Sequence, residues 1–251
     1  MNQHRFASML LGAAMIFFLI SCGGGTSNEQ KATSDSTSTD TTATTTAPTT
    51  QPSTSSIVTT PQDMMVVTNK VKDFAKWKAS YDEHDSMRLA SGIHSYVIGR
   101  GMPDSNMVLV AVKVDDMNKA KAFAKSPSLK QAMQKGGVVG APTIKFTTIV
   151  WQDTATISTT SRMRSTFSVK DWDTWKRTFD STMQLKTDNG LMPRAYGHDA
   201  DDNHKVTLVA AVLDSAKASA FFKSDELKKR RAAGGVVGEP QRFFYRVVQR
   251  Y

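Results

Sequence analysis

Three side chains in the first half of the chain have the types and spacing that acid–base or ligand-binding chemistry requires. His94, Tyr96 and Arg100 alternate with apolar or small residues in a segment expected to be extended. Alternation along a strand places such side chains on one face of the sheet. An imidazole near neutrality can accept a phenolic proton, and a nearby guanidinium stabilises the phenolate. We therefore expect these three residues to form a catalytic or ligand-binding site.

A second group is formed by Tyr81, His84 and Arg88, whose spacings of three and seven residues put them on one face of a predicted helix. This group could extend the site proposed above. Three acidic residues between positions 82 and 85 surround it, however, so a solvated helix face is an alternative interpretation. Trp77 and Trp175 occupy matching positions on apolar stripes and are expected to pack in the core.

The sequence predicts no metal site and no cofactor. The five histidines show no metal-ligand spacing, and the single cysteine excludes a cysteine-cluster site. Haem would require an axial histidine, and the helices predicted within residues 116–135 and 214–233 contain none. No phosphate-binding glycine loop and no nucleophile elbow is present.

The elements that must position these residues occur twice. Residues 63–153 align with residues 161–251 at a constant offset of 98, without a gap and with 30 identities in 91 pairs. The matches include Trp77-Lys78 with Trp175-Lys176, and the glycine-rich run 136–140 recurs at 234–238. Each repeat has the size of a small domain.

Each repeat is expected to fold in the order strand, helix, strand, strand, helix, strand. Asp73 and Asp171 are predicted N-caps, and Ser126-Pro127 predicts a break in the second helix of the first repeat. This order is that of the ferredoxin-like β-α-β-β-α-β unit, an α+β fold. The strand around residues 108–112 is apolar on both faces, so its sheet must be covered on both sides.

Three motifs carry a resemblance to a known group. Residues 71–78, 123–130 and 137–146, each with its counterpart 98 positions later, resemble the dimeric α/β-barrel superfamily, specifically antibiotic-biosynthesis-monooxygenase-like proteins. The resemblance implies that the two tandem ferredoxin-like units pair as an intrachain barrel with a space between them. It also implies three activities: cofactor-independent oxygenation of phenols, haem degradation or ligand binding. His94 and Tyr96 align with Met192 and Arg194, so the second repeat lacks the same pair.

The N-terminal residues predict the cellular location of the protein. Arg5 and an apolar run ending at Ile20 are typical of a signal peptide over residues 1–21. Residues 19–22 resemble a bacterial lipobox, which implies cleavage before Cys22 and its acylation. The glycines that follow favour, by analogy, the outer membrane. Residues 22–62 are mostly Ser and Thr and are expected to form a lipidated, disordered tether.

The formal charge of +9 is divided between both repeats, so we expect no dedicated nucleic-acid arm and no nucleic-acid partner. The densest basic run is Lys228, Lys229, Arg230 and Arg231. In a cell envelope such a run could meet anionic lipid, polysaccharide or an acidic ligand, or it could be a solvated helix face.

Two functions therefore remain open. The first is a lipid-anchored envelope protein that binds a small organic ligand between its repeats and could oxidise it as a cofactor-independent monooxygenase. The second is a non-catalytic interaction module whose basic surface binds an anionic polymer, a lipid surface or a protein. Because both halves of the barrel lie in one chain, we expect a monomer.

Overall fold

The computed structural model describes residues 56–251. The predicted signal peptide, Cys22 and the predicted tether up to residue 55 lie outside the described residues. No helix within the described part is long and apolar enough to cross a membrane.

Both repeats have the predicted β-α-β-β-α-β order, with each helical segment split in two. The first repeat comprises β2 (Gln62–Val71), α1 (Phe74–Glu83), α2 (Asp85–Leu89), β3 (Ile93–Gly101), β4 (Met107–Val114), α3 (Met117–Ala124), α4 (Pro127–Lys135) and β5 (Val138–Asp153). The second comprises β6 (Ser161–Val169), α5 (Trp172–Asp180), α6 (Met183–Asp188), β7 (Leu191–Asp199), β8 (Lys205–Val212), α7 (Ser215–Lys223), α8 (Asp225–Ala233) and β9 (Val236–Arg250).

The helix boundaries follow from local capping chemistry. The carboxylates of Asp73 and Asp171 accept hydrogen bonds from backbone N–H groups in the first turns of α1 and α5. Ser126 caps α4 in the same way, and Pro127 occupies the first turn, as predicted. These residues therefore fix where each helix starts against its sheet.

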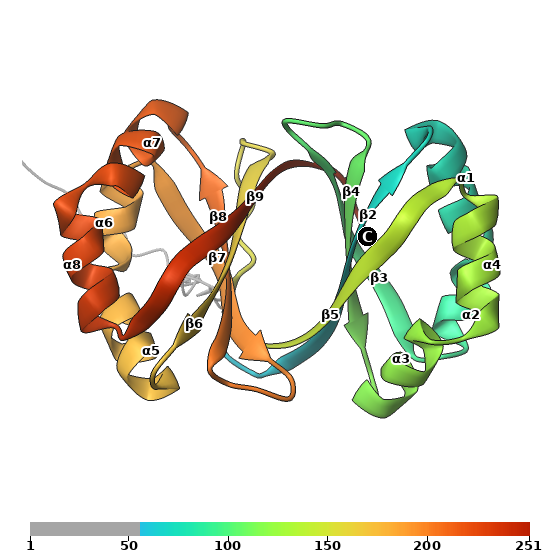
Figure 1. Ribbon diagram of the computed structural model, residues 1–251, viewed down its shortest axis with the longest axis horizontal. Helices are drawn as coiled ribbons and strands as arrows, with labels where there is room; N and C mark the ends of the chain where they lie inside the picture. The colour runs from blue at the N-terminus through green and yellow to red at the C-terminus, as the bar shows by residue number, and fades with distance from the viewer. Residues whose placement is uncertain (1–55) are drawn as a thin grey trace, which may run out of the picture. The chain divides into compact units, whose positions relative to one another are not determined.

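The strands form one closed antiparallel ring. Within each repeat the last strand pairs with the first, and it then continues to a strand of the other repeat: β5 pairs with β7, and β9 pairs with β3. Together with the order β5-β2-β4-β3-β9-β6-β8-β7, these pairings close an eight-stranded barrel. The helices of the two repeats cover its opposite outer sides (Figure 1). The expected intrachain α/β barrel is confirmed.

One boundary differs from expectation. Residues Ile57–Val58, which we placed in the tether, form a short strand, β1, that pairs with Asp153 and Gln152 at the end of β5. The folded part therefore begins before residue 63, because the long β5 offers an edge to which this apolar pair can add.

Two apolar layers hold the helices to the barrel. Trp77, Ile98 and Phe123 belong to the core of the first repeat. In the second repeat, Trp175 and Phe179 pack with Tyr196 in one cluster, and Phe221 belongs to another. The prediction that both tryptophans are core residues is confirmed.

Glycine is required at both places where the repeats meet. Gly99 on β3 faces Val247 on β9, and Gly197 on β7 faces Ile149 on β5. A Cβ on Gly99 would lie 2.2 Å from the ring of Tyr245, and a Cβ on Gly197 would lie 2.0 Å from the Thr148 carbonyl oxygen. Neither distance is sterically permitted, so a side chain here would force the strands apart.

We expect Gly197→Ala to destabilise the protein by about 3 kcal/mol, because its Cβ collides with backbone that cannot rotate away. Equilibrium chemical denaturation of the full chain measures this. Gly234→Ala is the matched control, since its Cβ would meet its nearest neighbours at 3.4 Å. Equal stabilities of the two variants would contradict the requirement for glycine where the repeats meet.

Candidate functional site

The barrel contains a cavity of about 270 Å³. Strands of both repeats form its wall, and the inter-repeat linker, residues 154–160, closes part of it. A cavity of about 150 Å³ accommodates benzene, so this one has room for a small organic molecule. The space expected between the repeats is therefore present.

The two repeats line this cavity with different chemistry. Inward positions of the first repeat carry Met64, Val66, Leu109, Ala111 and Ile149. Their counterparts 98 positions later are Arg162, Arg164, Thr207, Val209 and Val247. One wall is consequently apolar, whereas the other carries guanidinium groups.

A bulge in one strand of each repeat shapes the lining. The register of β3 shifts between Ser95 and Val97, and that of β7 shifts between Pro193 and Ala195. As a result, Tyr96 and Val97 both line the cavity, as do their counterparts Arg194 and Ala195. The unmatched pair Tyr96 and Arg194 thus occupies equivalent positions in one site.

Tyr96 and Arg194 are both held by neighbours near the end of β5. The Gln152 amide donates a hydrogen bond to the Tyr96 hydroxyl oxygen. Arg194 forms an ion pair of 2.8 Å with Asp153, and both side chains are less than a tenth exposed. Arg194 also donates to the carbonyl oxygen of Ala155 in the linker. These contacts anchor the linker at this end of the cavity.

The remaining arginines differ in their partners. Arg162 donates to the carbonyl oxygens of Thr159 and Ser161, at 2.7 and 2.9 Å. Within residues 56–251, no hydrogen bond or ion pair engages the guanidinium of Arg164 or of Arg250.

Burial lowers the pKa of Arg162 and of Arg164, and the charge of Arg250 adds to the effect at Arg162. Burial raises the pKa of Tyr245, which also lines the cavity, to about 12.

His94 and Arg100 lie outside the cavity, so the prediction that they share a site with Tyr96 is wrong. His94 is about half exposed and contacts Asp115 at 2.8 Å. Arg100 donates to the Ser105 carbonyl oxygen, and its guanidinium lies 4.3 Å from the ring centre of Phe74. The β3 bulge reverses the alternation after Ser95 and so turns Arg100 toward Phe74, whereas His94 precedes the bulge and lies at the exposed start of the strand.

Tyr81, His84 and Arg88 line a separate pocket of about 70 Å³ between the helices and sheet of the first repeat. The Tyr81 hydroxyl is hydrogen-bonded to Ser95, and His84 Nδ1 lies 2.6 Å from the Ser80 carbonyl oxygen. Arg88 lies over the Tyr81 ring at 3.6 Å and is 6% exposed. The solvated-face alternative is therefore wrong for Arg88.

Asn69, which no sequence pattern indicated, is buried in the same pocket. Its Nδ2 and the Nε of Arg88 have no hydrogen-bond partner in the described residues. A buried amide on a strand gives no spacing signal, and its counterpart in the second repeat is Phe167. The pocket is too small for an aromatic ring as it stands.

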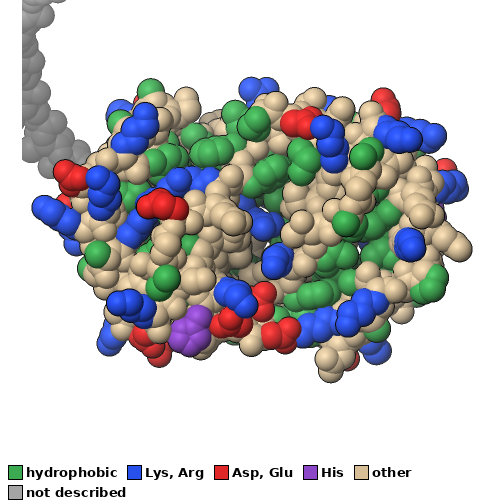
Figure 2. All heavy atoms as spheres, in the orientation of Figure 1, with side chains coloured by type: hydrophobic (Ala, Val, Ile, Leu, Met, Phe, Trp, Pro, Cys, Tyr) green, Lys and Arg blue, Asp and Glu red, His purple; other side chains and the backbone are tan. Residues whose placement is uncertain are grey.

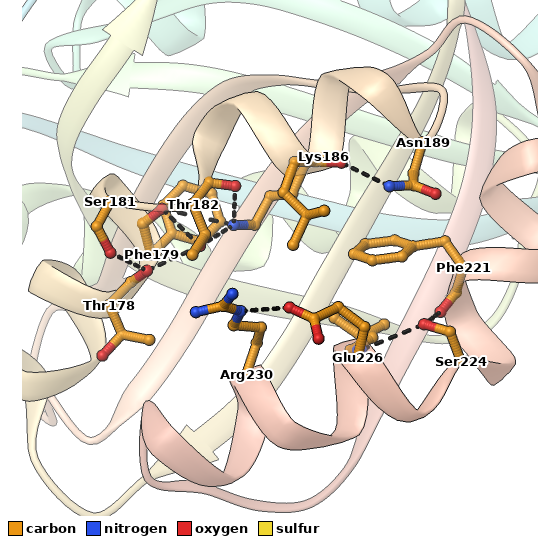
Figure 3. A network of polar contacts seen from close by, with 12 residues as sticks. Thr178, Phe179, Ser181, Thr182, Lys186, Asn189, Phe221, Ser224, Glu226 and Arg230 are labelled. Atoms are coloured by element: carbon orange, nitrogen blue, oxygen red, sulfur yellow. Dashed lines mark hydrogen bonds and ion pairs between the residues drawn. The ribbon is translucent and has the colours of Figure 1, made fainter.

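The equivalent pocket of the second repeat, about 100 Å³, contains Lys186 at the position of Arg88. Figure 3 shows the Lys186 ammonium directed at α5 and at the turn that follows it. It donates to the carbonyl and hydroxyl oxygens of Thr182, at 3.0 and 2.8 Å, and lies 4.0 Å from the Phe179 ring centre. Burial without an ion-pair partner lowers the pKa of Lys186 to about 8.

The predicted basic surface is largely neutralised. Lys228, Arg230 and Arg231 pair with Asp225, Glu226 and Glu239, at 3.0, 2.7 and 3.2 Å. Lys229 is exposed beside them. Figure 2 shows basic and acidic side chains interspersed over the visible face. No cluster of three metal-ligating side chains occurs among the described residues.

The comparison of structures identifies the fold. The chain is similar to an anthrone oxidase-like protein (TM-score 0.52, 14% identity, covering 77% of this chain and 94% of the other). It is also similar to a candidate monooxygenase from Fusobacterium nucleatum (TM-score 0.50, 12% identity, covering 75% and 93%). A haem-binding protein from Thermus thermophilus matches at a TM-score of 0.46 and 11% identity, covering 77% and 94%.

No protein-family model matches the sequence, and no curated protein matches it. The likeness to solved structures confirms the predicted tandem ferredoxin-like, dimeric α/β-barrel type of fold. At these identities it establishes the fold alone.

The lowered pKa of Lys186 makes stability depend on pH. Between about pH 8 and pH 10.5 the unfolded chain binds this proton and the folded chain releases it, so stability rises with pH. We expect the free energy of unfolding of the wild type, relative to Lys186→Met, to rise by about 3 kcal/mol across this range. Denaturation of both full chains at a series of pH values measures the difference.

Lys186→Arg places the first repeat's residue at this position and is the control. An arginine stays charged across the range, so this difference should not rise for it. A difference between wild type and Lys186→Met that is constant with pH would contradict the prediction.

Proposed function

We propose that this chain is a cell-envelope protein, anchored in a membrane through acylated Cys22, that binds one small organic molecule in the barrel cavity. The cavity itself carries the proposal: the interior of an eight-stranded barrel can be filled by side chains or can hold one small ligand, and this barrel leaves about 270 Å³ unfilled. The lining combines a broad apolar wall with a few polar groups, which is typical of ligand sites.

The lining favours binding over oxygenation. Deprotonating a phenolic substrate requires a base that is free near neutral pH. Among the described residues, no histidine lines the cavity, and the Asp153 carboxylate is paired with Arg194. Tyr96 is hydrogen-bonded to Gln152, and the pKa of Tyr245 is raised to about 12. The cavity therefore has groups that hold a ligand and lacks one that would activate it.

The alternative of an anionic polymer bound on α8 receives less support. Three of the four basic residues proposed for it already have carboxylate partners. Four basic residues and three carboxylates leave a net charge of +1 on this surface, which offers a polymer little electrostatic attraction.

Filling the cavity tests the proposal. We expect the full chain, purified from its own host in an uncharged detergent, to retain a small molecule in native mass spectrometry. Ala111→Phe should reduce the retained fraction at least tenfold, because the new ring occupies the lumen. Ala122→Phe on the exposed face of α3 is the control and should retain the molecule. Equal retention by both variants, or none by the wild type, would overturn the proposal.

A further inference from the structure

We infer that the ligand of the barrel is an organic anion, with an acidic group held by Arg164 and an apolar body packed against the first repeat. This inference rests on the proposed function and names its ligand class. It follows from the division of charge across the cavity and from the unpaired state of Arg164.

The cavity is strongly cationic on one side. Four arginines line it, namely Arg162, Arg164, Arg194 and Arg250, against the single carboxylate of Asp153. That carboxylate is occupied by Arg194 at 2.8 Å. Three positive charges are thus left without a carboxylate partner, and the burial of Arg162 and partial burial of Arg164 strengthen their attraction for an anion.

Arg164 is the arginine best placed to bind directly. Arg162 uses its Nη1 donors on two carbonyl oxygens. Arg164 is partly buried on β6 and has no hydrogen-bond acceptor among the described residues. Its guanidinium nitrogens remain accessible, unlike Nε of Arg88, so a carboxylate can accept two parallel hydrogen bonds from them.

Arg164 also lies where a ligand could enter. It lines the barrel cavity and, in addition, a hollow of about 350 Å³ formed by residues of β5, β6, β7, β8 and β9. Lys145 and Lys205 line this hollow together with Asp199 and Glu239. An acid group can therefore reach Arg164 from solvent while an attached body passes into the barrel.

The opposite wall selects the rest of the ligand. Met64, Val66, Leu109 and Ile149 offer apolar surface without a charged group. Val66 is the counterpart of Arg164 in the first repeat, so the same position has opposite chemistry on the two sides. A molecule with one acidic end and one apolar end matches both walls in one orientation.

Calorimetric titration with 2-naphthoate and its neutral analogue 2-naphthamide tests this inference. The full chain is used in an uncharged detergent, with titration into detergent alone subtracted. We expect the carboxylate to bind at least tenfold more tightly than the amide. Arg164→Gln should bring this ratio close to one, and Arg164→Lys should restore part of it. Arg246→Gln, an exposed arginine on the same strand as Arg250, is the control and should leave the ratio unchanged.

A second readout is independent of any probe. Removing an unpaired, partly buried charge should raise the Tm of the ligand-free chain, so Arg164→Gln is expected to be more stable than the wild type. A lower Tm for Arg164→Gln would indicate a structural role and would overturn the inference.

The outcomes separate this inference from the proposed function. Equal affinities for the two probes, both abolished by Ala111→Phe, would overturn the inference that the ligand is an anion. They would leave the proposal that the barrel binds a ligand. A retained native molecule that proves neutral would do the same. Failure of both probes to bind, with nothing retained from the host, would overturn both.

Discussion

Ring closure by two cross-repeat strand pairings determines the rest of this structure. β5 and β9 extend over 16 and 15 residues, long enough to pair within their own repeat and then with the other. At the two junctions a Cβ would collide with the Tyr245 ring or with the Thr148 carbonyl oxygen, so no side chain fits at either position. Gly99 and Gly197 meet this requirement. Once the ring is closed, each sheet has one face under helices and one face toward a shared interior.

The nature of that interior follows from which residues point inward. The first repeat contributes apolar side chains such as Val66 and Leu109, which pack with Tyr245 of β9. The second contributes arginines, and like charges do not collapse onto one another as apolar groups do. Repulsion from Arg250 and Arg194 adds to burial in lowering the pKa of Arg162. We therefore expect a hollow lumen where the apolar side chains of the first repeat face arginines that repel one another.

The sequence allowed the architecture to be predicted, but only part of the candidate site. The offset of 98 defined both repeats, and capping residues such as Asp73 and Ser126 located the helices. Strict alternation placed Arg100 with Tyr96, and it failed because a bulge depends on the partner strand, which a single strand's pattern does not reveal. The contrast between Val66 and Arg164 was visible in the alignment of the repeats. The significance of this contrast emerges only from the structure, in which both positions face one cavity.

The linker at residues 154–160 has a consequence for how the cavity comes into being. When two separate chains form such a barrel, assembly is a second-order process, and the fraction assembled falls on dilution. Here a seven-residue linker joins the second repeat to the first, so their association is first-order at a high effective concentration. The barrel cavity is therefore equally complete at low and at high protein concentration. Because each wall is encoded once, the two walls can differ in sequence.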